Sequence, residues 1–378
     1  MKVKFISLFI LLSVVLVYFY SCTDKNDNIT SSLNNPESLN KKSVNVTMTT
    51  FATGLNNPRG LEFGPDGYLY VAEGGTGGSQ TTTGTQCEQV PGAGPYSGDF
   101  NASISKISPN GTRTTVIDGL PSSQTNPQLG SLVSGVADVA FVNGQLYGIE
   151  AGAGCSHGLE GTDNTIFRVN SNGTKTDIVN LSDYQKANPV ANSEDEDFEP
   201  DGTWYSMISL RGDLYAVEPN HGEMVRVTTS GAISRVIDVS ASQGHIVPTV
   251  VAFHGNFYIG NLNTFPVALG SSSIFKVTPS GQIKKDAGGL TTVLGIAFDN
   301  KDRMYVLESI PTAGFPAVPP TPAKIVCILP NGQQQEIVTS GLILPSAMTM
   351  GPDGNLYVSN KGFGFGPGGG EIVKVTLN

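Results

Sequence analysis

A short apolar phrase of five residues recurs six times along the chain, and its second residue is a tyrosine in every copy. The copies are residues 69–73, 146–150, 214–218, 257–261, 304–308 and 356–360. Another short apolar segment lies upstream of each copy, and the residues between the two are turn formers such as Asp66-Gly67 and Asn143-Gly144. Strands joined by such dipeptides form β-hairpins. The pattern therefore predicts six hairpins.

A second pair of strands follows each hairpin except the last. In the first unit these strands are residues 104–107 and 114–117, joined by Asn110-Gly111. The sixth unit ends with its third strand, but residues 47–55 near the N-terminus match residues 112–120, which form the fourth strand of the first unit. The sequence thus predicts an all-β fold: a six-bladed β-propeller of four-stranded antiparallel blades, closed by an N-terminal strand that completes the last blade.

The segment before residue 44 lies outside this pattern. Lys2 and Lys4 precede an apolar run over residues 5–20, and a small residue, Ser21, precedes Cys22. This arrangement resembles a bacterial lipoprotein signal peptide, which implies cleavage before Cys22 and lipidation of that cysteine. The expected organisation is a signal peptide over 1–21, a flexible tether over 22–43 and the propeller domain over 44–378. The protein is then an exported lipoprotein anchored in a membrane, in the periplasm or at the cell surface. Plain secretion and an uncleaved membrane anchor are the alternatives.

Composition agrees with a turn-rich globular domain, and charge excludes one class of partner. The 378 residues include 46 glycines and 23 prolines, and 39% of them are hydrophobic, which is ample for a large core. The formal net charge is −10 at pH 7. Because a nucleic-acid partner requires a basic surface, we expect no nucleic acid among the partners.

Polar residues end the six tyrosine-containing strands at one face of the predicted propeller, here called the top face. They are Glu73, Glu150, Glu218, Asn261, Glu308 and Asn360. One hypothesis is that they ring the mouth of the central opening and bind a ligand. The alternative is a repeated structural role, in which each side chain accepts hydrogen bonds from backbone N–H groups of a neighbouring turn.

Three of the four histidines fall in loops of the same face: His157, His221 and His245. The fourth, His254, lies in a hairpin of the opposite, bottom face. Imidazole and carboxylate groups bind divalent cations, and a histidine can act as a general base near neutral pH. The candidate catalytic residues are these three top-face histidines. The candidate ligands of a divalent cation, Ca or Zn, are Glu150, Glu218, His157, His221 and His245. The candidate ligand-binding rim consists of Glu73, Glu308, Asn261, Asn360 and Glu223.

The remaining cysteines divide into a candidate pair and a candidate core residue. Cys87 and Cys155 occupy corresponding top loops of adjacent blades, and an exported protein can hold a disulfide between them. Unpaired thiols are the alternative. Cys327 lies on a strand among aliphatic residues and is expected to pack as a hydrophobe.

Six longer phrases resemble the ScyD/ScyE family of exported propellers, which has NHL-type repeats of the TolB-like class and is associated with synthesis of the pigment scytonemin. They are Asn57-Pro-Arg-Gly-Leu61, residues 64–73, residues 150–157, residues 199–205, residues 218–223 and Gly244-His-Ile-Val-Pro248. The resemblance covers about residues 50–378. It implies export and a propeller fold, and it carries over no catalytic residue.

Two classes of function follow from these observations. The first is a monomeric, lipid-anchored binding or scaffold module whose top face captures a small molecule, a glycan or an exported protein. The second is a metal-dependent lactonase or hydrolase, or an enzyme like strictosidine synthase, that uses the funnel of Glu and His residues. The second class is an analogy at the level of the fold.

Overall fold

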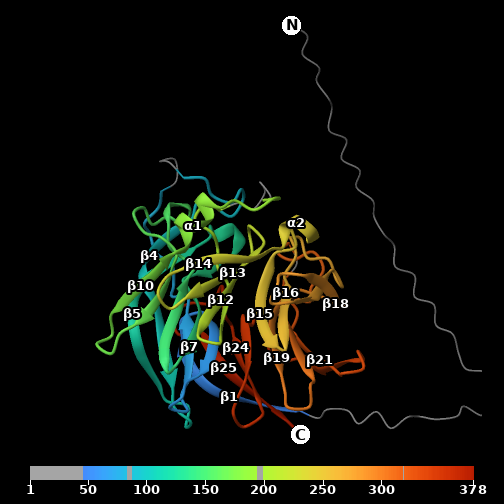
Figure 1. The fold of residues 1–378 in the computed structure, drawn as a ribbon. Coiled ribbons are helices and arrows are strands. Elements are labelled where there is room, and N and C mark those ends of the chain that lie inside the picture. The colour runs from blue at the N-terminus through green and yellow to red at the C-terminus, as the bar shows by residue number, and fades with distance from the viewer. Residues whose placement is uncertain (1–45, 83–86, 194–198, 318) are drawn as a thin grey trace, which may run out of the picture. The chain divides into compact units, whose positions relative to one another are not determined.

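The computed structural model describes residues 46–82, 87–193, 199–317 and 319–378, and these residues form six antiparallel β-sheets (Figure 1). The predicted signal peptide, Cys22 and the tether lie outside the described residues. In the described part of the chain, no helix is long and apolar enough to cross a membrane.

Each sheet is one blade, and its strands follow one another in chain order except where β1 joins the sixth blade. The first blade contains β2 (Pro58–Phe63), β3 (Leu69–Glu73), β4 (Ser97–Ile107) and β5 (Arg113–Gln124), and the two-residue β6 (Val133–Ser134) pairs with β5. The second contains β7 (Val136–Val142), β8 (Gln145–Glu150), β9 (Thr165–Val169) and β10 (Lys175–Asn180). The third contains β11 (Ser206–Leu210), β12 (Asp213–Glu218), β13 (Glu223–Thr228) and β14 (Ile233–Asp238).

The other three blades repeat this arrangement. The fourth contains β15 (Pro248–His254), β16 (Asn256–Asn261), β17 (Ser272–Val277) and β18 (Ile283–Leu290). The fifth contains β19 (Val293–Phe298), β20 (Met304–Glu308), β21 (Lys324–Ile328) and β22 (Gln334–Val338). The sixth contains β23 (Ala347–Met350), β24 (Leu356–Asn360), β25 (Gly370–Leu377) and β1 (Val46–Leu55). Short helices α1 (Leu181–Ala187) and α2 (Ser240–Gln243) and the 3-10 turns Pro127–Leu129 and Cys155–His157 lie in the connections.

Turn chemistry explains how the first two strands of a blade meet. Between β7 and β8, Asn143 and Gly144 have φ values of 50° and 80°, and the flanking residues Val142 and Gln145 pair. Positive φ at both central positions is the geometry of the tight hairpin turn that Asn-Gly favours. The hairpin predicted at this site is confirmed.

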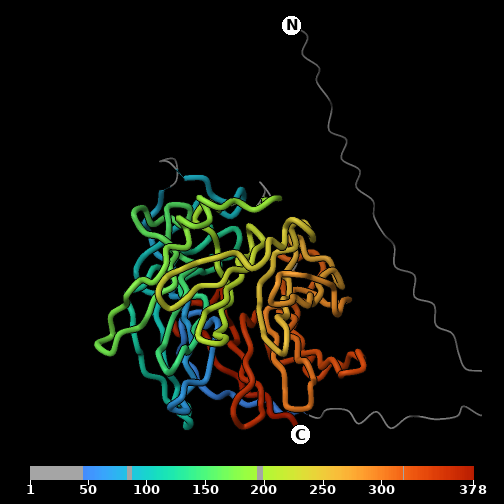
Figure 2. The backbone as a smooth tube through the Cα atoms, in the orientation of Figure 1, coloured from blue at the N-terminus to red at the C-terminus, as the bar shows by residue number. Residues whose placement is uncertain are grey.

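Closure of the last blade is confirmed by strand pairing. Strand β1 pairs antiparallel with β25, from Val46 opposite Leu377 to Leu55 opposite Gly370. Figure 1 shows the blue N-terminal strand beside the red C-terminal strands (Figure 2 traces the same path). The two ends of the described domain therefore share one sheet, as the match between residues 47–55 and 112–120 predicts.

The core lies between the blades. Among the described residues, six apolar clusters each join two neighbouring blades, so that every blade packs on both of its neighbours. The cluster between the sixth and first blades joins Leu55 and Ile372 to Leu61, and none of the three side chains is more than 6% exposed. Burial of apolar surface at every blade junction is the main favourable term for this fold. It also closes the ring.

Candidate functional site

The six residues that end the tyrosine-containing strands are buried, with exposed fractions of at most 6%. In four blades the side-chain oxygen accepts a hydrogen bond from a backbone N–H just before the first strand of the same blade. The donors are Asn56 for Glu73, Thr203 for Glu218, Thr291 for Glu308 and Ile343 for Asn360, at N···O distances of 2.6–2.8 Å. Each side chain thereby ties the entry loop of its blade to the second strand. These positions fit the repeated structural role and leave no shared rim of exposed groups.

Three buried carboxylates of this region have basic partners on the fourth strand of their own blade. The pairs are Glu73 with Arg113, Glu150 with Lys175 and Glu223 with Arg235, at 2.6, 2.9 and 2.6 Å respectively. Burial raises the pKa of Glu150, and the Lys175 ammonium opposes this effect. A buried charge is stable only when it is paired. The pairing explains how the blades accommodate these acids.

His157 belongs to a buried network of polar groups under the top loops. Its Nε2 lies 3.1 Å from Glu199 Oε2, and the Tyr96 hydroxyl donates to Glu199 Oε1 at 2.7 Å. Burial acts to lower the pKa of His157, but the Glu199 carboxylate outweighs it, so that the pKa is raised. The pKa of Glu199 is lowered, against the effect of burial, chiefly by His157. The two residues form an internal ion pair that joins the second blade to the loop before the third.

The other candidate metal ligands do not assemble with His157 into a cation site. His221 Nε2 lies 3.0 Å from the Glu199 backbone oxygen, and Glu218 accepts from the His221 N–H at 2.6 Å. His245 precedes β15, and Glu150 is bound to Lys175. Within the ranges that the structure describes, no group of three or more His, Cys, Asp or Glu side chains could hold a metal ion. The geometry therefore lends no support to Ca or Zn binding by the predicted set.

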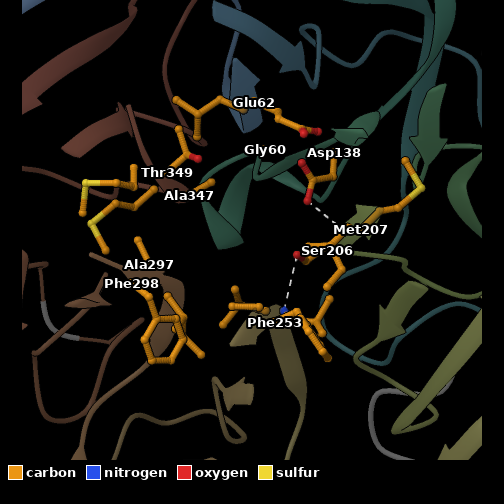
Figure 3. Close-up of a pocket in the computed structure, with 18 of the residues that line it drawn as sticks. Gly60, Glu62, Asp138, Ser206, Met207, Phe253, Ala297, Phe298, Ala347 and Thr349 are labelled. Atoms are coloured by element: carbon orange, nitrogen blue, oxygen red, sulfur yellow. Dashed lines mark hydrogen bonds between the residues drawn. The ribbon is translucent and has the colours of Figure 1, made fainter. Parts of the chain in front are cut away.

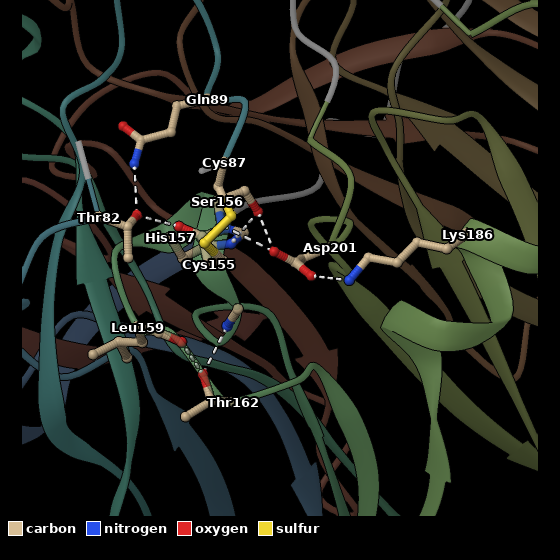
Figure 4. The surroundings of a disulfide bond; sticks show 11 residues. Thr82, Cys87, Gln89, Cys155, Ser156, His157, Leu159, Thr162, Lys186 and Asp201 are labelled. Carbon is tan, nitrogen blue, oxygen red and sulfur yellow. Dashed lines mark hydrogen bonds and ion pairs between the residues drawn. A yellow bond between two sulfur atoms is a disulfide. The ribbon is translucent and has the colours of Figure 1, made fainter. Parts of the chain in front are cut away.

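A disulfide between Cys87 and Cys155 is present, with Cα atoms 5.7 Å apart (Figure 4). It joins the loop that follows β3 to the loop that follows β8. The next residue, Ser156, donates to Asp201 at 2.8 Å, and Asp201 pairs with Lys186 at 2.6 Å. Cys327 is buried in β21, in the apolar cluster between the fifth and sixth blades. The disulfide and the polar network together brace the top loops of the first three blades.

A cavity of about 440 Å³ lies at the centre of the ring (Figure 3). Residues from the first strands of all six blades line it, from β2, β7, β11, β15, β19 and β23. The lining reaches the bottom-face hairpins at His254 and Met350. Pockets for small ligands usually measure about 300–1,000 Å³. The cavity is therefore large enough for a small organic molecule.

Two carboxyl groups occupy one wall of this cavity, and Figure 3 shows them pointing toward one another. Asp138 accepts from the N–H groups of Val139 and Met207, both at 2.8 Å. Glu62 accepts from the N–H of Phe141 at 3.1 Å. Burial raises the pKa of Asp138 to about 7, and burial together with the nearby Asp138 raises the pKa of Glu62 to about 7. The pair can hold or exchange a proton near neutral pH.

Apolar side chains from the top loops pack over the upper end of the cavity. They include Ile310, Leu344 and Phe363, which cluster with Leu294 of β19, and none of the four is more than 9% exposed. Arg59 adds to this cover, since its guanidinium lies over the rings of Tyr205 and Phe363 at 5.6 Å from each centroid. The Tyr205 hydroxyl donates to the Ser346 backbone oxygen at 3.0 Å. At the top face, where the sequence predicts the mouth, this apolar cluster therefore packs against the cavity lining at Leu294 and Tyr205.

Sequence reasoning missed Glu62 and Asp138, although a signal for Glu62 exists in the repeat. The residue paired with the tyrosine of each phrase is Glu62, Ala140, Ile208, Ala252, Ala297 or Thr349 in the six blades in turn. Only the first blade has an acidic residue at this inner position. A charged residue on the strand nearest the axis breaks the pattern that the other blades follow.

Comparison with known proteins shows the fold. No protein-family model matches the chain, and no curated protein sequence matches it. A solved Thermus thermophilus protein named as an oxidoreductase (glucose dehydrogenase) has 13% identity and a TM-score of 0.54, covering 88% of this chain and 100% of its own. A gluconolactonase from Xanthomonas campestris has 10% identity and a TM-score of 0.51, covering 90% and 96%. An auxiliary nutrient binding protein from Bacteroides thetaiotaomicron has 10% identity and a TM-score of 0.53, covering 88% and 76%. At these identities the likeness establishes a six-bladed β-propeller.

Proposed function

We propose that this chain is an exported, lipid-anchored β-propeller of the ScyD/ScyE type that binds a small molecule in its central cavity. The single observation that carries the binding site is the cavity of about 440 Å³, lined by all six blades and containing Glu62 and Asp138. The resemblance of residues 1–22 to a lipoprotein signal peptide supports export and an anchor at Cys22. The domain is proposed to act as a monomer.

The central cavity is a better binding site than the top-face rim that the sequence predicts. Side chains of that rim are buried and bound to backbone groups or to basic partners, as Glu73 and Glu223 are. A ligand at the rim would have to break these bonds. Glu62 is partly exposed to the cavity and accepts one hydrogen bond, so it retains capacity for a ligand.

A hydrolase acting in the same cavity is the second candidate function. The observation that favours it is the pair of adjacent carboxyl groups whose pKa values are both raised to about 7. One protonated and one ionised carboxyl group are what general acid–base catalysis requires. This candidate predicts turnover of a lactone or ester that is lost in both Glu62→Gln and Asp138→Asn.

Ligand screening with a narrowed-cavity variant tests the binding function. Thr349 lines the cavity and is partly exposed there, so Thr349→Trp narrows the space. The matched control is Thr114→Trp, because Thr114 is exposed on the outer strand β5. A compound that binds in the cavity stabilises the parent and the control by about 2.7 kcal/mol at 100 times its Kd. It raises the melting temperature of Thr349→Trp by less than that of the parent and the control.

The screen has two outcomes that contradict the proposal. One is a broad library of small molecules in which no compound shifts the melting temperature of the parent. The other is a compound that stabilises Thr349→Trp as much as the parent, since that compound binds elsewhere. Circular dichroism of both tryptophan variants establishes first that they fold.

A further inference from the structure

We propose that the central cavity selects ligands that carry a positive charge, such as protonated amines and quaternary ammonium compounds. This inference rests on the proposed binding function and adds the chemical class of the ligand. It follows from the charged groups that line the cavity and from the partners that each of them has.

The charged carboxyl groups that line the cavity are all negative when ionised. Among the described residues that line the cavity, none is a lysine or an arginine, whereas Glu62, Asp138 and Asp299 are acidic. Asp299 is already paired with Arg303 at 2.5 Å, and His254 at the bottom end contacts Asp302 at 2.9 Å. Two acids, Glu62 and Asp138, are therefore left to set the charge of the interior.

No basic side chain pairs with these two acids in the described part of the chain. Asp138 is held by backbone N–H groups and by the Ser206 hydroxyl, and Glu62 by one backbone N–H. Arg59 is the neighbour of Gly60 on the same strand, but its guanidinium lies over Tyr205 and donates to the Val133 backbone oxygen. The buried acids Glu73, Glu150 and Glu223 each have a basic partner, whereas Glu62 and Asp138 face a cavity that has no lysine or arginine among the described residues of its lining.

A cationic ligand would supply the positive charge that Glu62 and Asp138 lack in the folded protein. Two neighbouring carboxyl groups in a low-dielectric site do not both ionise without a positive charge nearby. Their raised pKa values agree with this absence. The other walls provide apolar surface, from residues such as Met207, Phe253 and Phe298, for the body of an organic cation. An anionic ligand of the same size would meet two carboxyl groups and no compensating charge.

The lining also indicates the route into the cavity. The top loops cover the upper end, and Phe363 there is only 7% exposed. At the bottom end the His254 side chain is 41% exposed, and Met350 and Thr349 are partly exposed. We therefore expect a ligand to enter between the bottom-face hairpins.

Charged thiol reagents test the sign of the electrostatic potential in the cavity, and they require no known ligand. The full chain carries Cys22→Ser, so that the thiol left unbonded is the buried Cys327. Thr349→Cys then places a thiol in the cavity, and Thr114→Cys places one on the exposed strand β5 as the matched control. Each thiol is reacted with three methanethiosulfonates: cationic trimethylammonioethyl, anionic sulfonatoethyl and neutral methyl. The measured quantity is the ratio of the cationic rate to the anionic rate, which cancels differences in thiol reactivity.

We expect this ratio to be at least about tenfold higher in Thr349→Cys than in Thr114→Cys, because a one-sign cavity concentrates ions of the opposite sign by factors of that order. Adding Glu62→Gln to Thr349→Cys should lower the ratio, and adding Asp138→Asn as well should bring it close to the control. If the variant with both Glu62→Gln and Asp138→Asn does not fold, the comparison uses the variant with Glu62→Gln alone added to Thr349→Cys.

The outcomes separate this inference from the binding function. Equal ratios at the two thiols, with fast reaction of the neutral reagent in the cavity, overturn the cationic preference and leave an accessible binding cavity. No reaction of Thr349→Cys with any of the three reagents overturns the accessible cavity itself, and the cationic preference with it. A high ratio that is unchanged by Glu62→Gln and by Asp138→Asn shows that the two acids are not its source, which also overturns the inference.

Discussion

At the scale of single residues, ionisation of Glu62 and Asp138 opposes folding. Their pKa values are raised to about 7 in the native protein, from 4.5 and 3.8. Between about pH 4 and pH 7 the native state then holds more protons than the unfolded state, so the free energy of unfolding falls as pH rises through this range. We expect the free energy of unfolding of Glu62→Gln to depend less steeply on pH, by up to about 1.4 kcal/mol per pH unit, because this variant lacks one of the two titrating carboxyl groups. Urea denaturation at pH 4.5, 6 and 8 measures it.

The control for this titration is Glu160→Gln, because Glu160 is an exposed carboxylate outside the cavity. Its slope should match that of the parent. If Glu62→Gln also keeps the slope of the parent, Glu62 titrates alike in the folded and unfolded states, and the account of the cavity acids is wrong.

Residues whose environment is local to one repeat could be predicted, and so could the disulfide between corresponding loops of two blades, but the meeting of acidic side chains across blades could not. The place of Glu73 at the end of a second strand follows from the repeat, and so does the alternative role of accepting backbone hydrogen bonds. Glu62 and Asp138 are 76 positions apart and meet only because the first and second blades pack side by side. His157 finds Glu199 across a loop of irregular length in the same way. Periodicity predicts strands, but the pairing of side chains between blades depends on the closed ring.

At the scale of elements, the approach of β2 to β7 depends on Gly60. A Cβ atom at Gly60 would lie 1.8 Å from Asp138 Oδ1 and 2.8 Å from the Asp138 Cα. The second contact is with backbone, so a change of rotamer at Asp138 does not relieve it. We expect Gly60→Ala to destabilise the domain by about 1–3 kcal/mol, the usual cost of overpacking. Urea denaturation at a single pH measures the change.

Gly366→Ala is the matched control for this prediction. Gly366 is exposed, a Cβ atom added there would meet no other atom within 4 Å, and the position does not require a positive φ. Its free energy of unfolding should stay within about 0.5 kcal/mol of the parent, as for most surface substitutions. A Gly60→Ala variant as stable as Gly366→Ala would show that the first two blades do not pack so closely at this point.

At the scale of the whole molecule, closure of the ring by β1 leads us to expect that all six blades unfold as one cooperative unit. Leu55 on β1 is fully buried between the sixth and first blades, and its counterpart in the repeat, Leu120 on β5, is 3% exposed between the first and second. Because the two side chains fill equivalent blade junctions, Leu55→Ala and Leu120→Ala should each cost about 2–5 kcal/mol. Both should shift one unfolding transition of the entire domain.

Thr47→Ala, at an exposed position of the same strand as Leu55, should leave that transition in place. A Leu55→Ala variant that unfolds like the parent, or that splits the transition into two, would mean that the N-terminal strand does not hold the last blade in the ring. The central cavity would then lose one of the six blades that line it.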